Sequence, residues 1–159
     1  MKALRLDRHL LFTLGLFMVI LAGCAGSPSS KFYQLNSLQN SNLTAHAASP
    51  EQDLIIAIGP VRIPDYLDRP QIVTRAGINE LRLSEFDRWA GSLESDIIRV
   101  LAENISSLLS AERLSVVRWT PYRESQAPAQ YRVEMFVDRF EGTPGDSVLL
   151  KARWIVFAH

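Results

Sequence analysis

Cys24 is the first residue to explain, because it is the only cysteine in the 159 residues. A single cysteine excludes an intramolecular disulfide and leaves a free thiol, an intermolecular bridge or a covalently modified side chain. The residues before it run Leu21-Ala22-Gly23. Two small residues directly before a cysteine suit a peptidase that must approach the backbone closely, and this favours a processed and modified residue.

The segment before Cys24 has the parts of an export signal. Basic residues stand at positions 2, 5 and 8, and an apolar run, LLFTLGLFMVIL, extends from Leu10 to Leu21. A helix needs about 20 apolar residues to cross a bilayer, so this run fits a cleaved signal better than a membrane anchor. The end of the segment resembles the bacterial lipobox. We therefore predict a signal peptide over 1–23, cleavage between Gly23 and Cys24, and acyl chains such as palmitate on Cys24.

Composition and motifs argue against nucleic-acid binding and catalysis. The leader holds three of the 17 basic residues and one of the 17 acidic ones, so the remainder is slightly acidic and has no basic stripe for phosphates. His46 and His159 stand apart, and no spacing of His, Cys, Asp and Glu predicts a metal site. A hydrolase is the weakest hypothesis, because no nucleophile can be paired with a base. We predict no enzyme activity, no metal and no cofactor.

The mature chain divides into two parts. Residues 24–52 comprise the modified N-terminus, a small polar tether over 25–31, a short strand over 32–35 and a polar loop. Residues 53–159 form the main domain, and 47% hydrophobic residues in the whole chain suffice for a core. Apart from one helix, its predicted elements are strands over 54–63, 71–75, 79–83, 114–119, 131–140 and 147–158, with a bulge or bend at Gly59-Pro60.

The helix is predicted over Asp87–Ala111, with Ser84 or Asp87 as its cap. Apolar residues recur at spacings of three and four from Trp89 onward, which indicates one apolar stripe.

In the strand over 131–140, alternation places Tyr131, Val133, Met135 and Val137 on one face, and Phe136 and Phe140 on the other.

The predicted fold class is α+β: a mixed or antiparallel sheet, covered on one face by the long amphipathic helix. The sequence stops at His159, in or just after a strand, so we expect the domain to be incomplete at its C-terminal end.

Three blocks of sequence carry a resemblance to a known family. They are IGPVRIPDYLDRPQIV over 58–73, FDRWA over 86–90 with RVLAEN over 99–104, and YRV over 131–133 with RFE over 139–141 and LKARW over 150–154. Together with the lipobox, they resemble the PqiC/YmbA family of ABC-type transport auxiliary lipoproteins.

The resemblance implies an accessory role in transport between membranes. Its expected partners are an MCE-domain protein and the inner-membrane transporter of that system, which moves lipid or maintains membrane integrity. Ala25, and not Asp, follows Cys24, so by analogy the anchor lies in the periplasmic face of the outer membrane instead of the inner membrane. A homo-oligomer is an option by analogy alone. Two other functions remain open: a lipid-binding module that carries substrate itself, and a structural envelope lipoprotein without a transporter.

The turn between Pro64 and Pro70 has two interpretations. It is either a rigid connection between strands or an exposed loop that presents a contact surface to a partner. The second interpretation has a physical basis, because a rigid turn loses little entropy on binding. The candidate contact residues in it are Asp65, Tyr66, Leu67 and Arg69.

Overall fold

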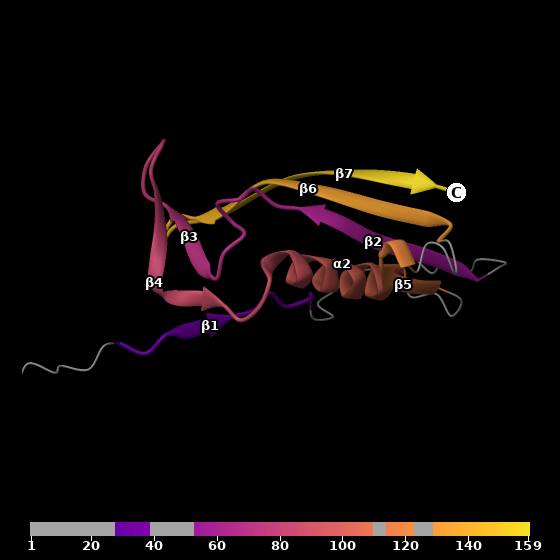
Figure 1. Cartoon of the computed structure of the whole chain (residues 1–159), viewed down its shortest axis with the longest axis horizontal. Coiled ribbons are helices and arrows are strands. Elements are labelled where there is room, and N and C mark those ends of the chain that lie inside the picture. Colours follow the sequence, from indigo (N-terminus) through magenta and orange to yellow (C-terminus); the bar gives the residue numbers. More distant parts are fainter. Residues whose placement is uncertain (1–27, 39–52, 110–113, 123–128) are drawn as a thin grey trace, which may run out of the picture.

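The computed structural model describes residues 28–38, 53–109, 114–122 and 129–159. Within them, seven strands form one sheet, and helix α2 (Leu93–Leu109) lies alongside it (Figure 1). The strands are β1 (Lys31–Tyr33), β2 (Leu54–Arg62), β3 (Gln71–Arg75), β4 (Leu81–Trp89), β5 (Leu114–Arg118), β6 (Tyr131–Gly142) and β7 (Val148–Ala158).

Strand β6 is the centre of the sheet. Antiparallel β7 pairs with it from Tyr131 to Gly142, while parallel β2 and β3 pair with its first half and its last residue. Because β7 occupies one edge of β6 throughout, β2 and β3 follow each other along the other edge. β5 lies parallel beyond β2, β4 lies antiparallel beyond β3, and β1 lies parallel beyond β4. The predicted mixed sheet and the α+β class are confirmed.

The core lies between α2 and the central strands. Buried side chains from β2, β3, β6, α2 and the 64–70 turn meet there: Ile58, Val61, Leu67, Val73, Leu93, Ile97, Ile98 and Val137. The residues of α2 among them recur at the spacing of one helix face, which is why this sequence packs as a helix. On β6, Val133 and Met135 pack against the same cluster, as the alternation predicted.

The predicted start of the helix is wrong by six residues. Asp87–Trp89 belong to β4, and the helix begins at Leu93. Ser92 is its cap, because its hydroxyl accepts a hydrogen bond from the Ser95 N–H at 3.3 Å. Trp89 instead pairs with β1 and stacks on Phe140 with ring centroids 6.0 Å apart. Pairing with neighbouring strands decides that these residues form a strand and not a helix. The spacing of apolar residues along one segment does not reveal such pairing.

The predicted face of Phe140 is also wrong. The pairing of β6 with β7 shifts register between Val137 and Arg139, which marks a β-bulge. An extra residue in one strand exchanges the two faces beyond it. Phe140 therefore packs against the core on the same side as Val137, and not with Phe136.

The helix does not cover a whole face of the sheet. It packs against β2 and β5. On β7, Trp154 and Val156 stand opposite Met135 and Val133, and so on the core side, yet they remain 65% and 56% exposed. The predicted cover of one face is therefore not confirmed, and α2 does not cover β7 at Trp154 and Val156.

Gly59 permits the bend that sequence predicted in β2. Its φ is +116°, a region that side chains disfavour, and the register of β2 against β6 shifts between Ile58 and Val61. A Cβ at this position would meet Ile98 and Trp119 at 3.8 Å, which is ordinary contact. Any cost of a substitution here is therefore backbone strain and not a clash.

We expect Gly59→Ala to lower the free energy of unfolding by at least about 1 kcal/mol, because alanine must adopt the strained φ. Gly91→Ala is the matched control, since Gly91 has no positive φ and nothing lies within 4 Å of its added Cβ. Urea denaturation followed by circular dichroism measures both variants. Equal stability of the two alanine variants would contradict the assignment of strain.

Candidate functional site

The conformation of the 64–70 turn is fixed by contacts that its own residues make with the interior of the protein. The Leu67 N–H donates to the Pro64 carbonyl at 2.8 Å, and the Leu67 side chain is only 2% exposed within the core. The half-buried Tyr66 donates its hydroxyl to Glu141 at 3.1 Å. Asp65 is exposed and Arg69 half-buried. The structure thus places Leu67 and Tyr66 as the anchors of the turn, and Asp65 as the candidate contact residue that faces solvent.

Glu141 is the buried carboxylate on which this turn rests. Arg75 from β3 and Arg139 from β6 form ion pairs with it, in addition to the bond from Tyr66. Burial raises the pKa of Glu141, but the hydrogen bonds from Arg75, Arg139 and Tyr66 outweigh it, so the pKa lies below its ordinary value. Burial and the Glu141 carboxylate together raise the pKa of Tyr66. At neutral pH the Glu141 carboxyl is therefore ionised, and the Tyr66 hydroxyl keeps the proton that it donates to Glu141.

A second buried carboxylate, Asp96, ties the N-terminal segment to α2. It accepts hydrogen bonds from the Leu35 N–H at 3.1 Å and from Gln34 at 3.2 Å, and Arg99 of the same helix pairs with it. Burial raises the pKa of Asp96, but these hydrogen bonds outweigh it and hold the pKa below its usual range. The Arg99 guanidinium also donates to the Leu35 carbonyl. Both backbone groups of Leu35 are thereby fixed against the helix.

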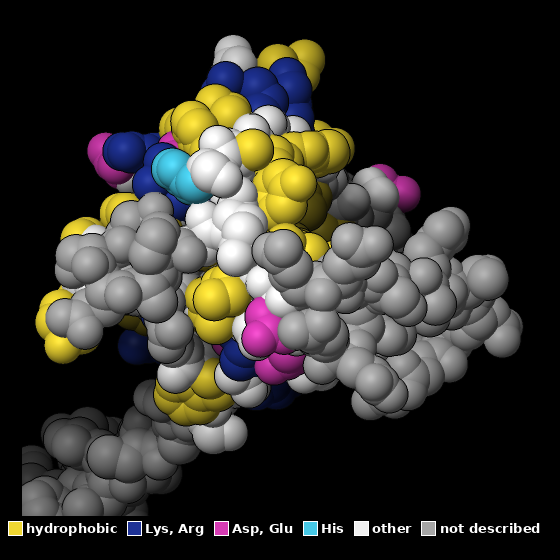
Figure 2. Space-filling model, turned by 90° about the vertical axis from the view of Figure 1, so that its right-hand side faces the viewer, with side chains coloured by type: hydrophobic (Ala, Val, Ile, Leu, Met, Phe, Trp, Pro, Cys, Tyr) yellow, Lys and Arg dark blue, Asp and Glu magenta, His cyan; other side chains and the backbone are white. Residues whose placement is uncertain are grey.

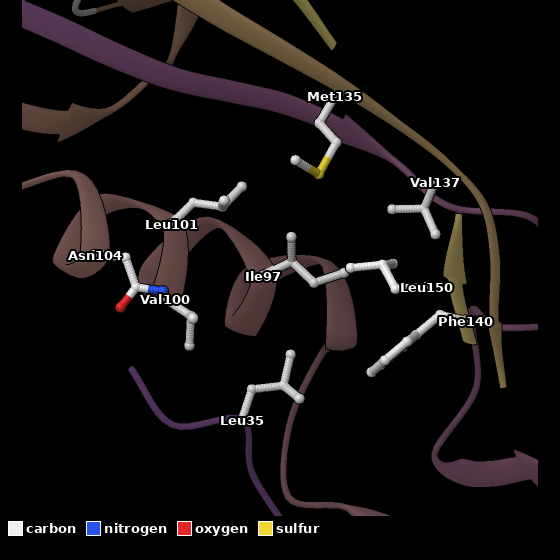
Figure 3. Close-up of a pocket in the computed structure, with 9 residues that line it drawn as sticks. All are labelled: Leu35, Ile97, Val100, Leu101, Asn104, Met135, Val137, Phe140 and Leu150. Carbon is white, nitrogen blue, oxygen red and sulfur yellow. The ribbon is translucent and has the colours of Figure 1, made fainter. Parts of the chain in front are cut away.

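An apolar slot of about 210 Å³ lies where Leu35 faces α2 and β6 (Figure 3). Its lining residues are Leu35, Ile97, Val100, Leu101, Asn104, Met135, Val137, Phe140 and Leu150. All except Asn104 present hydrocarbon or thioether groups. The side-chain oxygen of Asn104, Oδ1, accepts a hydrogen bond from the Leu38 N–H at 2.8 Å. We call this cavity the apolar slot below.

Strand β7 carries many exposed large hydrophobic side chains. Six of its large side chains are 44% to 73% exposed: Val148, Leu149, Leu150, Trp154, Ile155 and Val156. The face away from α2 also holds Arg153, which pairs with Asp138 at 2.9 Å. At the end of the molecule where β7 finishes, hydrophobic side chains lie on the surface beside basic ones (Figure 2). The alternation of the strand places Leu150, Trp154 and Val156 on the α2 side, and Leu149 and Ile155 on the opposite face beside Arg153. Exposed apolar side chains gathered on one strand are typical of an interaction surface.

Sequence reasoning missed Asp96 and Glu141. The predicted helix contained Asp96 without a separate role for it, and the predicted strand ended at Phe140, one residue before Glu141. The only available signal was a carboxylate beside apolar residues, and this does not reveal partners that lie more than 60 residues away.

Several other predictions fall outside the described residues. These include the signal peptide with Gly23 and Cys24, the residue Ala25, and His46. Among the described residues, no group of three His, Cys, Asp or Glu side chains could hold a metal ion. No helix in the same ranges has the length and hydropathy to span a membrane.

A family model described as "ABC-type transport auxiliary lipoprotein component" matches residues 33–159. The chain belongs to this family. The match includes the 64–70 turn, both buried carboxylates and every residue of the apolar slot. It confirms the resemblance drawn from the three sequence blocks, and it supports association with an ABC transporter. No curated protein matches the chain.

Two solved structures share the fold. One is an uncharacterised protein with 15% identity and a TM-score of 0.55, over 82% of this chain and 81% of its own. The other is protein XCC0632 from Xanthomonas campestris, of the DUF330 family, with 15% identity and a TM-score of 0.52, over 81% and 77% of the two chains. At this identity the comparison establishes the fold alone.

We expect Glu141→Gln to lower the free energy of unfolding at pH 7 by about 1–3 kcal/mol, because two arginines lose their buried counter-ion. Since the pKa of Glu141 is depressed in the fold, its contribution is complete above the unfolded-state value of about 4.3 and declines as the pH falls below that value. Denaturation of wild type and variant between pH 3 and 7 measures this difference.

The matched control is Glu103→Gln, which removes an exposed partner of Arg99 on α2. It is expected to cost less than about 0.5 kcal/mol. A difference between wild type and Glu141→Gln that stays constant down to pH 3 would show that the buried carboxylate does not supply the stability.

Proposed function

We propose that the chain is a periplasmic lipoprotein, anchored to the outer membrane through Cys24, that serves as accessory subunit of an MCE/ABC-type lipid transport system. In this role it helps to maintain membrane integrity and has no catalytic step. The observation that carries the proposal is the family match over residues 33–159. The lipobox supplies the anchor, and Ala25 after Cys24 favours the outer membrane over the inner one.

The position of β1 supports a body held close to the bilayer. β1 begins at Lys31 and is fixed by parallel pairing with β4. Lys31 lies only seven positions after Cys24, and a fully extended chain over seven steps spans at most about 25 Å. A lipid on Cys24 would therefore keep the domain beside the membrane, where a transporter component that bridges the periplasm could reach it.

The proposed contact surface for the MCE-domain protein is the outer side of the 64–70 turn. Leu67 and the bond from Tyr66 to Glu141 hold the turn in one conformation, so docking would order few further residues. Asp65 offers an exposed charge, and Arg69 lies half-buried in the same turn. Leu67 and Tyr66 act here as supports of the surface.

The apolar slot bears on the alternative that this module carries lipid by itself. Sites that enclose a drug-sized ligand measure roughly 300–1,000 Å³. A slot of about 210 Å³ is smaller, so it does not enclose a lipid with two chains. The accessory role is therefore favoured over that of an independent carrier.

We expect Cys24→Ala to abolish recovery of the protein in the outer-membrane fraction, because the thioether cannot form and the leader stays uncleaved. The domain should still fold, since the core that the structure describes is formed by residues from Leu35 onward. Fractionation of envelopes and mass spectrometry of the N-terminus test this, with Ser27→Ala as the control. Normal outer-membrane recovery and wild-type envelope integrity in Cys24→Ala would rule out anchoring by this residue.

We expect Asp65→Arg to reduce the amount of MCE-domain protein that co-purifies with the chain by about fivefold, because a reversed charge in a contact costs about 1 kcal/mol or more. Asp146→Arg makes the same change in the exposed turn between β6 and β7 and should leave recovery unchanged. If both variants recover the partner equally, the 64–70 turn is not the contact surface.

A further inference from the structure

We propose that the apolar slot is a binding site for one hydrocarbon chain that bears a hydrogen-bond acceptor, such as a carboxylate or an ester carbonyl, at its Asn104 end. This site is separate from the contact surface proposed above and does not depend on docking.

The shape of the slot matches a chain. Its helical wall runs from Ile97 to Asn104, a rise of about 10 Å along α2. Leu35 closes the side opposite β6, and Met135 and Val137 point into the space from β6 (Figure 3). A cavity of about 210 Å³ stretched over this length is narrow. It is larger than the roughly 150 Å³ cavity that admits benzene, and its length favours an extended ligand over a compact one.

The chemistry of the lining restricts the occupant further. A water molecule needs two to four polar partners, and among the described residues that line the slot Asn104 has the only polar side chain. Its oxygen already accepts from the Leu38 N–H, which leaves the side-chain NH₂ as a donor at one end of the slot. The NH₂ group lies on the Val100 side of the amide, toward the other lining residues (Figure 3). A hydrocarbon chain can pack against the apolar walls, and an acceptor at its head can accept a hydrogen bond from the Asn104 NH₂ group.

The slot is also accessible. Leu150, one of its lining residues, is 57% exposed on β7, an edge strand of the sheet that the described residues form. A chain can therefore enter from solvent or from a bilayer surface without unfolding of the core. Phe140 stays in place as a wall because it stacks on Trp89.

Photolabelling of the full acylated protein in vesicles of phosphatidylethanolamine and phosphatidylglycerol tests the proposal. One arm uses phosphatidylethanolamine with a diazirine on one chain, and a second uses diazirine-bearing palmitic acid. In a third arm, cells grown on that fatty acid supply protein whose own acyl chains carry the label. We expect adducts on peptides that cover 97–104 and 135–140, and the arm that yields them identifies the source of the chain.

Val100→Phe should reduce these adducts about tenfold, because the ring displaces about two methylenes at about 0.8 kcal/mol each. Val148→Phe makes the same exchange at a site 73% exposed and outside the slot, and it should label like wild type. Leu150→Glu, at an exposed wall residue, should also reduce the adducts and carries little risk of misfolding. Equal labelling of Val100→Phe, Leu150→Glu and wild type would overturn the proposal. Absence of slot adducts in all three arms would also overturn it, and would favour an apolar side chain of a partner as the occupant.

Discussion

The arrangement of the central sheet depends on the hydrogen bonds and ion pairs that converge on the buried Glu141 carboxylate. Tyr66 from the turn, Arg75 from β3 and Arg139 from β6 all bind it. A buried carboxylate is costly unless it is paired and hydrogen-bonded, so these donors must be present together. Their convergence places β3 behind β2 along one edge of β6. The orientation of the exposed Asp65 is thus set by a contact inside the protein.

Asp96 plays the same part for the N-terminal segment. By binding the backbone of Leu35, it fixes the residue that closes the apolar slot, a short distance along the chain from β1 and the tether. The membrane anchor proposed at Cys24 and one wall of the slot therefore belong to one continuous segment. This links the anchoring of the domain to the geometry of its apolar cavity through a hydrogen bond to a buried carboxylate.

Hydrophobic periodicity predicted most elements of the fold, and its two errors have a common origin. Trp89 follows the spacing of the helix stripe but lies in β4, and Phe140 follows the alternation of β6 but crosses to the core side at the bulge. In both cases a neighbouring strand determined the outcome. Periodicity describes one segment at a time, whereas strand pairing and bulges depend on a partner elsewhere in the chain.

The sequence by itself determined the α+β class, the family and the prediction of a lipid anchor, because these rest on local patterns and on contiguous motifs such as the run from Ile58 to Val73. Only the tertiary structure decided the two carboxylate clusters, the slot and the partial cover by α2. Each joins residues far apart in the chain, as Glu141 joins Tyr66 and Arg75. Burial and hydrogen bonding between such residues arise when the chain is folded, so no local pattern encodes them.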